Sequence, residues 1–339
     1  MHPATLRAPP GTLMRMTATM RAVHARQAGG PEVLRPTELP VPQPGEGELL
    51  LRLAATGVNF VDTYRRTGLY PMAFPHVPGA EGAGTVEAVG PGVTDWEPGD
   101  RAATAEASGT YAEYAVVRAD RAAKVPEGVD LRVAAAVPLQ GLTAQYLLTS
   151  VHPVDDGTTL LVHAGAGGVG LLLIQLAKAR GATVLTTVGS PEKRALAAAA
   201  GADHVLGYDD FAERAKELTG GEGVDVVYDG VGRSTFDGSL ASLRPRGTLA
   251  LFGNASGPVD PIDPLRLMRQ GSVLLTRPTM GDFLRTRIER AWRYAEVLGA
   301  VGAGTLDVRI GAELPLADAA EAHRALEGRR TTGKVLLVP

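Results

Sequence analysis

The chain has 339 residues, of which 34 are basic and 37 acidic, a net charge of −3 and a mean hydropathy near zero. This length exceeds what one hydrophobic core usually supports, so two domains are expected. No basic run or membrane-length apolar stretch occurs, so neither nucleic acid nor membrane is an expected partner, and the absence of cysteine excludes disulfides, thiolate nucleophiles and cysteine-ligated metal sites.

The N-terminal residues 1–19 contain three prolines, no acidic residue and no apolar core of the kind that a secretory signal needs. We interpret residues 1–19 as a disordered extension that precedes the first domain. We expect the protein to be cytoplasmic.

Short β-type runs with frequent proline and glycine turns follow, from Arg21 to about Val117. The runs are Glu48–Ala55, Gly84–Val89, Arg101–Ala105 and Tyr114–Val117. They predict a compact β domain of the barrel type. The next segment, Arg132–Leu148, is predicted to be a helix.

From Thr159 onward, β-type runs alternate with helical segments. The predicted strands are Thr159–His163, Thr183–Val188, His204–Leu206, Val224–Asp229, Thr248–Phe252 and Ser272–Leu275. The alternation predicts a doubly wound parallel sheet of six strands, a Rossmann fold, with its ligand at the carboxyl ends of the strands. After about Arg277, helices at Asp282–Leu298 and Ala317–Glu327 and a strand at Lys334–Val338 are predicted to return to the first domain.

The first strand of this sheet leads through a glycine-rich turn into a helix that starts near Val169. Gly165, Gly167 and Gly170 have the G-x-G-x-x-G spacing of a dinucleotide site. The first glycine permits the tight turn, the second lets the backbone approach a pyrophosphate, and the third lets the helix pack on the strand. The N–H groups at the start of the helix would face the anion.

The second strand ends at Gly189 and Ser190, where an NAD site would place an acidic residue for the ribose hydroxyls. Ser190 and Lys193 favour NADP instead, because a hydroxyl and an ammonium can both bind a 2′-phosphate. Ser190 followed by Pro191 is also a helix-start signal, and the two interpretations are compatible.

Several strings match more than a generic Rossmann protein. They are Gly57–Asp62, Arg65–Tyr70, Pro78–Glu81, Gln140–Ala144, Tyr228–Asp229, Phe252–Gly257 and Leu275–Thr279. Together they resemble the zinc-independent quinone oxidoreductases of the medium-chain dehydrogenase/reductase superfamily. The resemblance implies an α/β protein in which a GroES-like, partly open β-barrel catalytic domain, residues 20–140 and 277–339, flanks a Rossmann NADPH-binding domain, residues 141–276.

The same resemblance bears on metals and on the reaction. Zinc-dependent relatives have a cysteine ligand where this chain has Asn59 and a histidine where it has Ala80, and the histidines here are scattered singly, so no metal is expected. Without such a Lewis acid, hydride from NADPH is expected to go to an acceptor that is already electron-poor, a quinone. The alternative acceptor is an enone or a 2-enoyl thioester.

The resemblance also points to the hydrogen-bond donors of the substrate site, Asn59, Tyr64 and Tyr70. We interpret Asn59 and Tyr64 as groups that polarise or position the acceptor. Tyr70 matches the catalytic tyrosine of related enoyl-thioester reductases and is our candidate proton donor. Asp62 and Arg65, three positions apart, are interpreted as a structural pair on a helical turn.

Cofactor contacts follow from the resemblance in three groups, from the nicotinamide to the adenosine phosphate. They are Thr143, Asn254 and Ser256 near the nicotinamide or its ribose; Gly168 and Val169 under the pyrophosphate; and Tyr208 and Arg329, with Ser190 and Lys193, around the phosphate.

The resemblance also implies a homodimer, and the apolar run Ser272–Thr276 could pair with its copy edge to edge. A nucleic-acid-binding or bulk structural role, known among relatives, is disfavoured by the charge balance.

Overall fold

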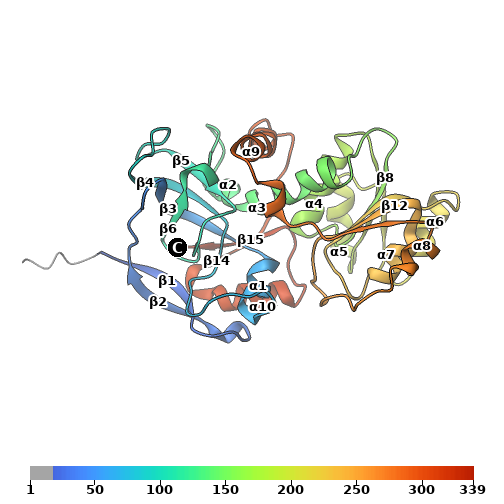
Figure 1. The fold of residues 1–339 in the computed structure, drawn as a ribbon, viewed down its shortest axis with the longest axis horizontal. Helices are drawn as coiled ribbons and strands as arrows, with labels where there is room; N and C mark the ends of the chain where they lie inside the picture. The colour runs from blue at the N-terminus through green and yellow to red at the C-terminus, as the bar shows by residue number, and fades with distance from the viewer. Residues whose placement is uncertain (1–17) are drawn as a thin grey trace, which may run out of the picture.

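The computed structural model of the protein describes residues 18–339 and shows two lobes side by side (Figure 1). The prediction for residues 1–17 lies outside the described residues, and Thr19 already belongs to the first strand. One lobe is rich in β-structure and contains both the first and the last strand of the chain. The other lobe is α/β and is built from the middle of the chain.

A seven-stranded sheet forms the centre of the β-rich lobe, in the order β14-β15-β3-β4-β5-β7, with β6 paired to β3. Its strands are β3 (Glu48–Val58), β4 (Gly82–Val89), β5 (Arg101–Thr104), β6 (Tyr114–Arg118), β7 (Ala123–Lys124), β14 (Ile310–Pro315) and β15 (Lys334–Val338). Because β15 pairs antiparallel with β3, the end of the chain is anchored beside the segment that begins helix α1 (Phe60–Thr67).

A separate antiparallel pair, β1 (Thr19–Ala25) and β2 (Leu34–Pro40), lies at the edge of this lobe. The sequence analysis missed this pair, because Pro36 and Pro40 cannot donate to a ladder and weaken the strand signal of β2. Helix α10 (Ala319–Glu327) packs nearby, next to α1.

The second lobe is a parallel six-stranded sheet in the order β10-β9-β8-β11-β12-β13, which confirms the predicted doubly wound fold. The strands are β8 (Thr159–Val162), β9 (Thr183–Thr187), β10 (His204–Leu206), β11 (Val224–Asp229), β12 (Leu243–Leu251) and β13 (Leu274–Thr276). The accompanying helices are α4 (Gly168–Lys178), α5 (Pro191–Ala199), α6 (Phe211–Leu218), α7 (Phe236–Ser242) and α8 (Leu265–Arg269).

The helix predicted over Arg132–Leu148 is in fact interrupted. It consists of α2 (Leu131–Ala136) and α3 (Pro138–Tyr146), followed by a π-helical turn over Leu147–Val151. Pro138 lacks an N–H group, so it starts a helix rather than continuing one. Helix α3 packs on α4 and on α9 (Arg287–Gly302). The start of α9 is five residues later than predicted, because Thr286 caps it by accepting a hydrogen bond from the Glu289 N–H.

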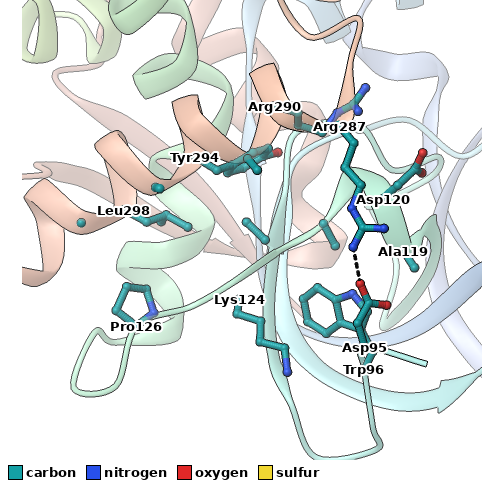
Figure 2. Close-up of a pocket in the computed structure, with 15 residues that line it drawn as sticks. Asp95, Trp96, Ala119, Asp120, Lys124, Pro126, Arg287, Arg290, Tyr294 and Leu298 are labelled. Carbon is teal, nitrogen blue, oxygen red and sulfur yellow. Dashed lines mark hydrogen bonds and ion pairs between the residues drawn. The ribbon is translucent and has the colours of Figure 1, made fainter. Parts of the chain in front are cut away.

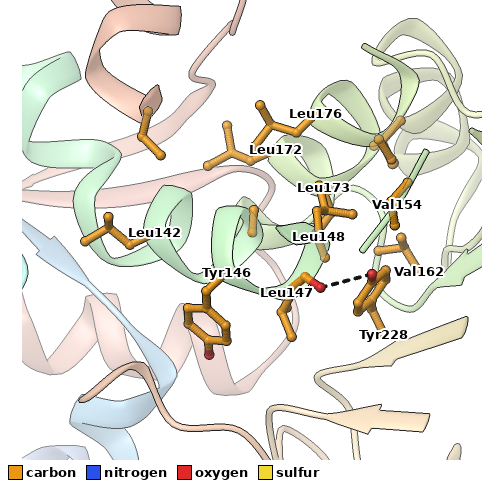
Figure 3. Packing of buried hydrophobic residues seen from close by; sticks show 14 of the residues in the cluster. Leu142, Tyr146, Leu147, Leu148, Val154, Val162, Leu172, Leu173, Leu176 and Tyr228 are labelled. Carbon is orange, nitrogen blue, oxygen red and sulfur yellow. Dashed lines mark hydrogen bonds between the residues drawn. The ribbon is translucent and has the colours of Figure 1, made fainter. Parts of the chain in front are cut away.

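The largest apolar core joins α3, α4 and the first strands of the parallel sheet. Figure 3 shows Leu172, Leu173 and Leu176 of α4 close to the end of α3, and the buried Tyr228 donating its hydroxyl to the Leu147 carbonyl at 3.2 Å. This packing fixes α3 against α4, the helix that follows the glycine-rich turn. Within residues 18–339, no helix is long and apolar enough to cross a membrane.

Candidate active site

A cleft of about 1130 Å³ is lined by residues of both lobes. Five of the predicted site residues line it, namely Asn59, Tyr64, Tyr70, Thr143 and Val169. A second cavity of about 410 Å³ lies between α9 and loops of the β-rich lobe, and an Arg287–Asp95 ion pair of 2.6 Å spans it (Figure 2). None of the predicted residues lines this second cavity, so the candidate site is the larger cleft.

Tyr64 and Tyr70 lie together in the cleft, with ring centroids 5.2 Å apart. The Tyr64 hydroxyl accepts a hydrogen bond of 2.9 Å from the Asn254 N–H, and the Tyr70 hydroxyl accepts one of 3.0 Å from Arg277 Nη2. Each hydroxyl therefore keeps its own hydrogen available for donation. Burial raises the pKa of Tyr64 to about 12, so this tyrosine stays a donor at neutral pH.

Arg277 is a site residue that the sequence analysis did not single out. Its Nη1 donates to the Leu251 carbonyl at 2.6 Å, which fixes the guanidinium at the carboxyl end of the parallel sheet. With the Asn254 carboxamide oriented so that its oxygen faces Arg277, that oxygen lies 3.0 Å from Nη2. The position of Arg277 directly after the last parallel strand was the available signal.

Asn59 belongs to a fully buried cluster with Glu81 and Lys334. Its Oδ1 accepts from Lys334 Nζ at 2.7 Å, and its Nδ2 donates to Glu81 Oε2 at 2.7 Å. Lys334 Nζ also donates to Glu81 Oε2, and the two charged side chains are 1% and 0% exposed. Both ends of the Asn59 carboxamide are thus occupied by protein groups. The sequence analysis assigned no role to Glu81 and did not consider Lys334.

Asp62 accepts hydrogen bonds at the start of the helix that carries Tyr64. Its Oδ2 accepts from the Asn59 N–H at 3.0 Å and from the Tyr111 hydroxyl at 3.3 Å, whereas Oδ1 is buried without a hydrogen-bond partner. These partners replace the predicted contact with Arg65. Burial raises the pKa of Asp62 from 3.8 to about 6.

We expect the Asp62→Asn variant to be more stable than the parent at pH 8, by about 1 to 2 kcal/mol. The pKa of Asp62 is higher in the folded state than in the unfolded state, so ionised Asp62 lowers the free energy of unfolding. This destabilisation is fully present above about pH 6 and is nearly absent below about pH 4, where the carboxyl is protonated in both states. Denaturant titrations at both pH values measure this difference. A variant that loses stability at pH 8 would contradict it.

The predicted glycines have distinct structural reasons. A Cβ on Gly165 would lie 2.0 Å from Thr186 Oγ1, and one on Gly170 would lie 2.4 Å from the Ala164 carbonyl. A Cβ on Gly168 would lie 2.0 Å from Gln140 Oε1, whereas one on Gly167 would have only the Ala164 carbonyl within 4 Å, at 3.1 Å. Gly167 therefore has the least crowded Cβ position of the four glycines, and as the N-cap of α4 it lies where the backbone can meet a pyrophosphate.

The residues predicted around the adenosine phosphate lie near one another, and the charge of Arg329 acts on the Tyr208 hydroxyl. Ser190 caps α5 by accepting from the Lys193 N–H at 3.3 Å, which confirms the helix-start interpretation. Lys193 Nζ donates to the Arg329 carbonyl at 2.7 Å. Tyr208 stacks on the buried His163 ring, with centroids 6.2 Å apart, and burial raises its pKa. Ser190 and Lys193 are half-buried and Arg329 is exposed, and their hydroxyl and two cationic groups fit a phosphate ester.

The last predicted residues differ in how they face the cleft. Thr143 lines it, although its hydroxyl also donates to the Leu139 carbonyl at 2.7 Å. Asn254 touches the site through Tyr64 and Arg277. Ser256 is committed to the loop after β11, because its hydroxyl donates to the Val231 carbonyl at 2.8 Å and accepts from the Ser234 N–H at 3.0 Å.

Two family profiles match the chain. The family described as alcohol dehydrogenase GroES-like domain matches residues 45–127, and the one described as zinc-binding dehydrogenase matches residues 168–296. Across residues 18–339, no three histidine, aspartate or glutamate side chains lie close enough to hold a metal ion.

Individual proteins match over nearly the whole chain. A quinone oxidoreductase of Pseudomonas aeruginosa is 44% identical over 92% of this chain and 97% of its own length. A 2-haloacrylate reductase of a Burkholderia species is 42% identical over 92% of this chain and 96% of its own. A mycobacterial protein solved in complex with NADPH is 55% identical, with a TM-score of 0.93 over 94% of this chain and all of that one.

Proposed function

The chain belongs to the zinc-independent quinone oxidoreductases of the medium-chain dehydrogenase/reductase superfamily, and we propose from this that it reduces quinones with NADPH. The observation that carries the proposal is the cleft itself. Two tyrosine hydroxyls with hydrogens to donate, Tyr64 and Tyr70, line the same cavity as Val169 at the start of the cofactor helix.

The described residues fit NADPH along its length. Gly167 and the N-terminus of α4 would hold the pyrophosphate, while Lys193, Ser190 and Arg329 would hold the 2′-phosphate. NADPH supplies a hydride when it is bound.

The chain's own groups would handle the charge and the proton. Tyr64 and Tyr70 would donate hydrogen bonds to the quinone oxygen that gains negative charge as the hydride arrives. Tyr70 would then transfer its proton to that oxygen and regain one from water, since it lines the cleft and is only half-buried. Quinone, hydride and one proton give the hydroquinone, so atoms and electrons balance.

Initial rates of NADPH and NADH oxidation with a naphthoquinone, measured in buffer with a metal chelator, test this function. Fast, NADPH-selective oxidation that ignores the chelator is the expected result. If neither nucleotide is oxidised with any quinone, the proposed function is wrong.

An activated alkene is the second candidate acceptor. The 2-haloacrylate reductase among the relatives favours it, because that name describes reduction of an alkene next to a carboxyl group. An enone or 2-enoyl thioester in the same assay decides between the two acceptors. Reduction of the thioester but not the quinone would leave the fold and cofactor assignments intact and move Tyr70 to the centre of the reaction.

We also propose that the protein is a homodimer joined along the edge of the parallel sheet. Strand β13 is an edge strand, and large exposed apolar residues lie on or near it: Leu265, Met268 and Leu274, which are 55%, 60% and 62% exposed. An exposed apolar edge is suited to pairing with its own copy.

The Leu274→Lys variant is expected to be a monomer, because a buried ammonium would face its own copy across the two-fold axis. Light scattering at micromolar concentration measures the mass. Ile288→Lys is the matched control, since Ile288 is 84% exposed on α9 and lies outside this edge. A parent protein that is already monomeric would refute the dimer.

We retain the division into a catalytic part, residues 20–140 and 277–339, and an NADPH-binding part, residues 141–276. The seven-stranded and six-stranded sheets support this division, since each takes all its strands from one of the two parts. A cytoplasmic location, where NADPH would be supplied, completes the proposal.

A further inference from the structure

Glu81 is a fully buried carboxylate that bonds three different parts of the chain. Its Oε1 accepts from the Leu139 N–H at 2.7 Å, and its Oε2 accepts from Asn59 Nδ2 at 2.7 Å and from Lys334 Nζ. Glu81 itself lies directly before β4. No other carboxylate among residues 18–339 joins these three segments.

Two of the three partners of Glu81, Asn59 and Leu139, line the cleft themselves. Asn59 is the N-cap of α1, which carries Tyr64. Leu139 lies in the first turn of α3, which carries the cleft residues Gln140 and Thr143.

Lys334 connects Glu81 to the glycine loop. It follows Gly333, whose N–H donates to the Ala166 carbonyl at 2.9 Å, and Gly333 also forms a β-bridge with Gly167. Glu81 thus contacts the starts of α1 and α3 directly, and it reaches the glycine loop through Lys334 and the neighbouring Gly333.

The surrounding backbone is shaped for this cluster. A Cβ on Gly57 would lie 2.1 Å from Glu81 Oε2 and 2.6 Å from Lys334 Cε, so only glycine leaves room for the ion pair. A buried ion pair is seldom the most stable way to fill such a space, since apolar side chains of similar volume are often as stable or more stable. Its presence here calls for a reason other than stability.

We propose that Glu81 is a positioning residue, which sets α1 and α3 at the distance from the glycine loop that hydride transfer requires. The inference rests on the proposed function for its catalytic consequence. Glu81 does not line the cleft, so its carboxylate acts through Asn59, Leu139 and Lys334. Misplacement of a bound reactant by about 1 Å costs roughly 100-fold in rate, so even a small shift of either helix would be detectable.

A double-mutant cycle with Glu81→Gln and Lys334→Met separates positioning from stability. Each single substitution leaves a buried charge or polar group unpaired, and we expect each to lower the midpoint of thermal unfolding by about 10 °C. The double variant removes both charges at similar volume and is expected to unfold near the parent's temperature. Its kcat is nevertheless expected to fall about 100-fold, with little change in KM or in the Kd of NADPH.

The matched control is the double variant Asp225→Asn with Arg244→Met. The two side chains of this ion pair are 2.5 Å apart and lie near the starts of β11 and β12. They are therefore at the amino ends of the parallel strands, whereas the proposed ligand site is at the carboxyl ends. Its removal is expected to leave kcat unchanged. If the Glu81 and Lys334 double variant keeps the parent's kcat, Glu81 has no positioning role.

A second measurement makes the inference independent of quinone turnover. Fluorescence of bound NADPH reports how closely the nicotinamide is enclosed in the cleft. We expect the parent to enhance the emission of bound NADPH, and the double variant to bind NADPH with the same Kd but without that enhancement. Equal emission would overturn the inference even if the parent reduces no quinone. If the double variant does not fold, Glu81→Gln alone, measured at low temperature, gives the same readout.

Discussion

Replacing Tyr64 and Tyr70 together by phenylalanine is expected to lower kcat for quinone reduction by about 100- to 1000-fold. Removal of one preorganised donor to a developing oxyanion costs roughly 2.7 to 4 kcal/mol, and the two hydroxyls lie in one cleft with their hydrogens available. The KM for the quinone should change less, because the bonds strengthen mainly in the transition state. Steady-state rates with a naphthoquinone measure both constants.

The single variants and one control show which hydroxyl causes the fall in kcat. Tyr70→Phe alone should remove proton transfer, while Tyr64→Phe alone should also leave the Asn254 N–H without its partner. Tyr114→Phe is the matched control, because this half-buried tyrosine of β6 lies outside the cleft. A double variant that turns over at the parent's rate would show that neither hydroxyl takes part.

The Lys193→Ala variant is expected to use NADPH about 10- to 100-fold less well, with NADH little affected. Lys193 Nζ donates one hydrogen bond to the Arg329 carbonyl, at 2.7 Å, and has two further N–H groups that can donate to a phosphate. Loss of this one charge-assisted contact should weaken binding by roughly 1.5 to 3 kcal/mol, and only for NADPH, because only NADPH carries the 2′-phosphate. The ratio of kcat/KM for the two nucleotides measures it.

Lys178→Ala provides the control for charge. Lys178 lies on α4 of the same lobe and binds Asp203 at 2.9 Å, away from the phosphate group of residues. It should leave the preference between the nucleotides unchanged. An equal fall in kcat/KM for NADPH and NADH in Lys193→Ala would mean that Lys193 serves only to hold the segment around Arg329 against α5.

Local patterns in the sequence predict much of this fold. Two of the parallel strands, His204–Leu206 and Val224–Asp229, match their predicted bounds, because short apolar runs between turn residues leave little choice of secondary structure. The glycine loop was predicted from the spacing of Gly165, Gly167 and Gly170 after the first parallel strand. The break at Pro138 was missed, because apolar periodicity continues across it although the helix does not.

The site was predictable only where a motif or a strand end marks it. Glu81 and Lys334 are separated by 253 positions, and nothing in either local sequence indicates that the other exists. Their pairing follows from β15 lying beside β3, a long-range contact that periodicity does not encode. Arg277 differs, since its place after a parallel strand could have identified it.

The most direct test of the account follows one turnover with NADPH that carries deuterium on a single face of the nicotinamide, with a naphthoquinone and a metal chelator. We predict slower oxidation for deuterium on one face only and transfer of that deuterium away from the nucleotide, unaffected by the chelator. This result would show direct hydride transfer in a cleft that fixes the ring. Equal rates for both faces, or a reaction that the chelator stops, would contradict the account.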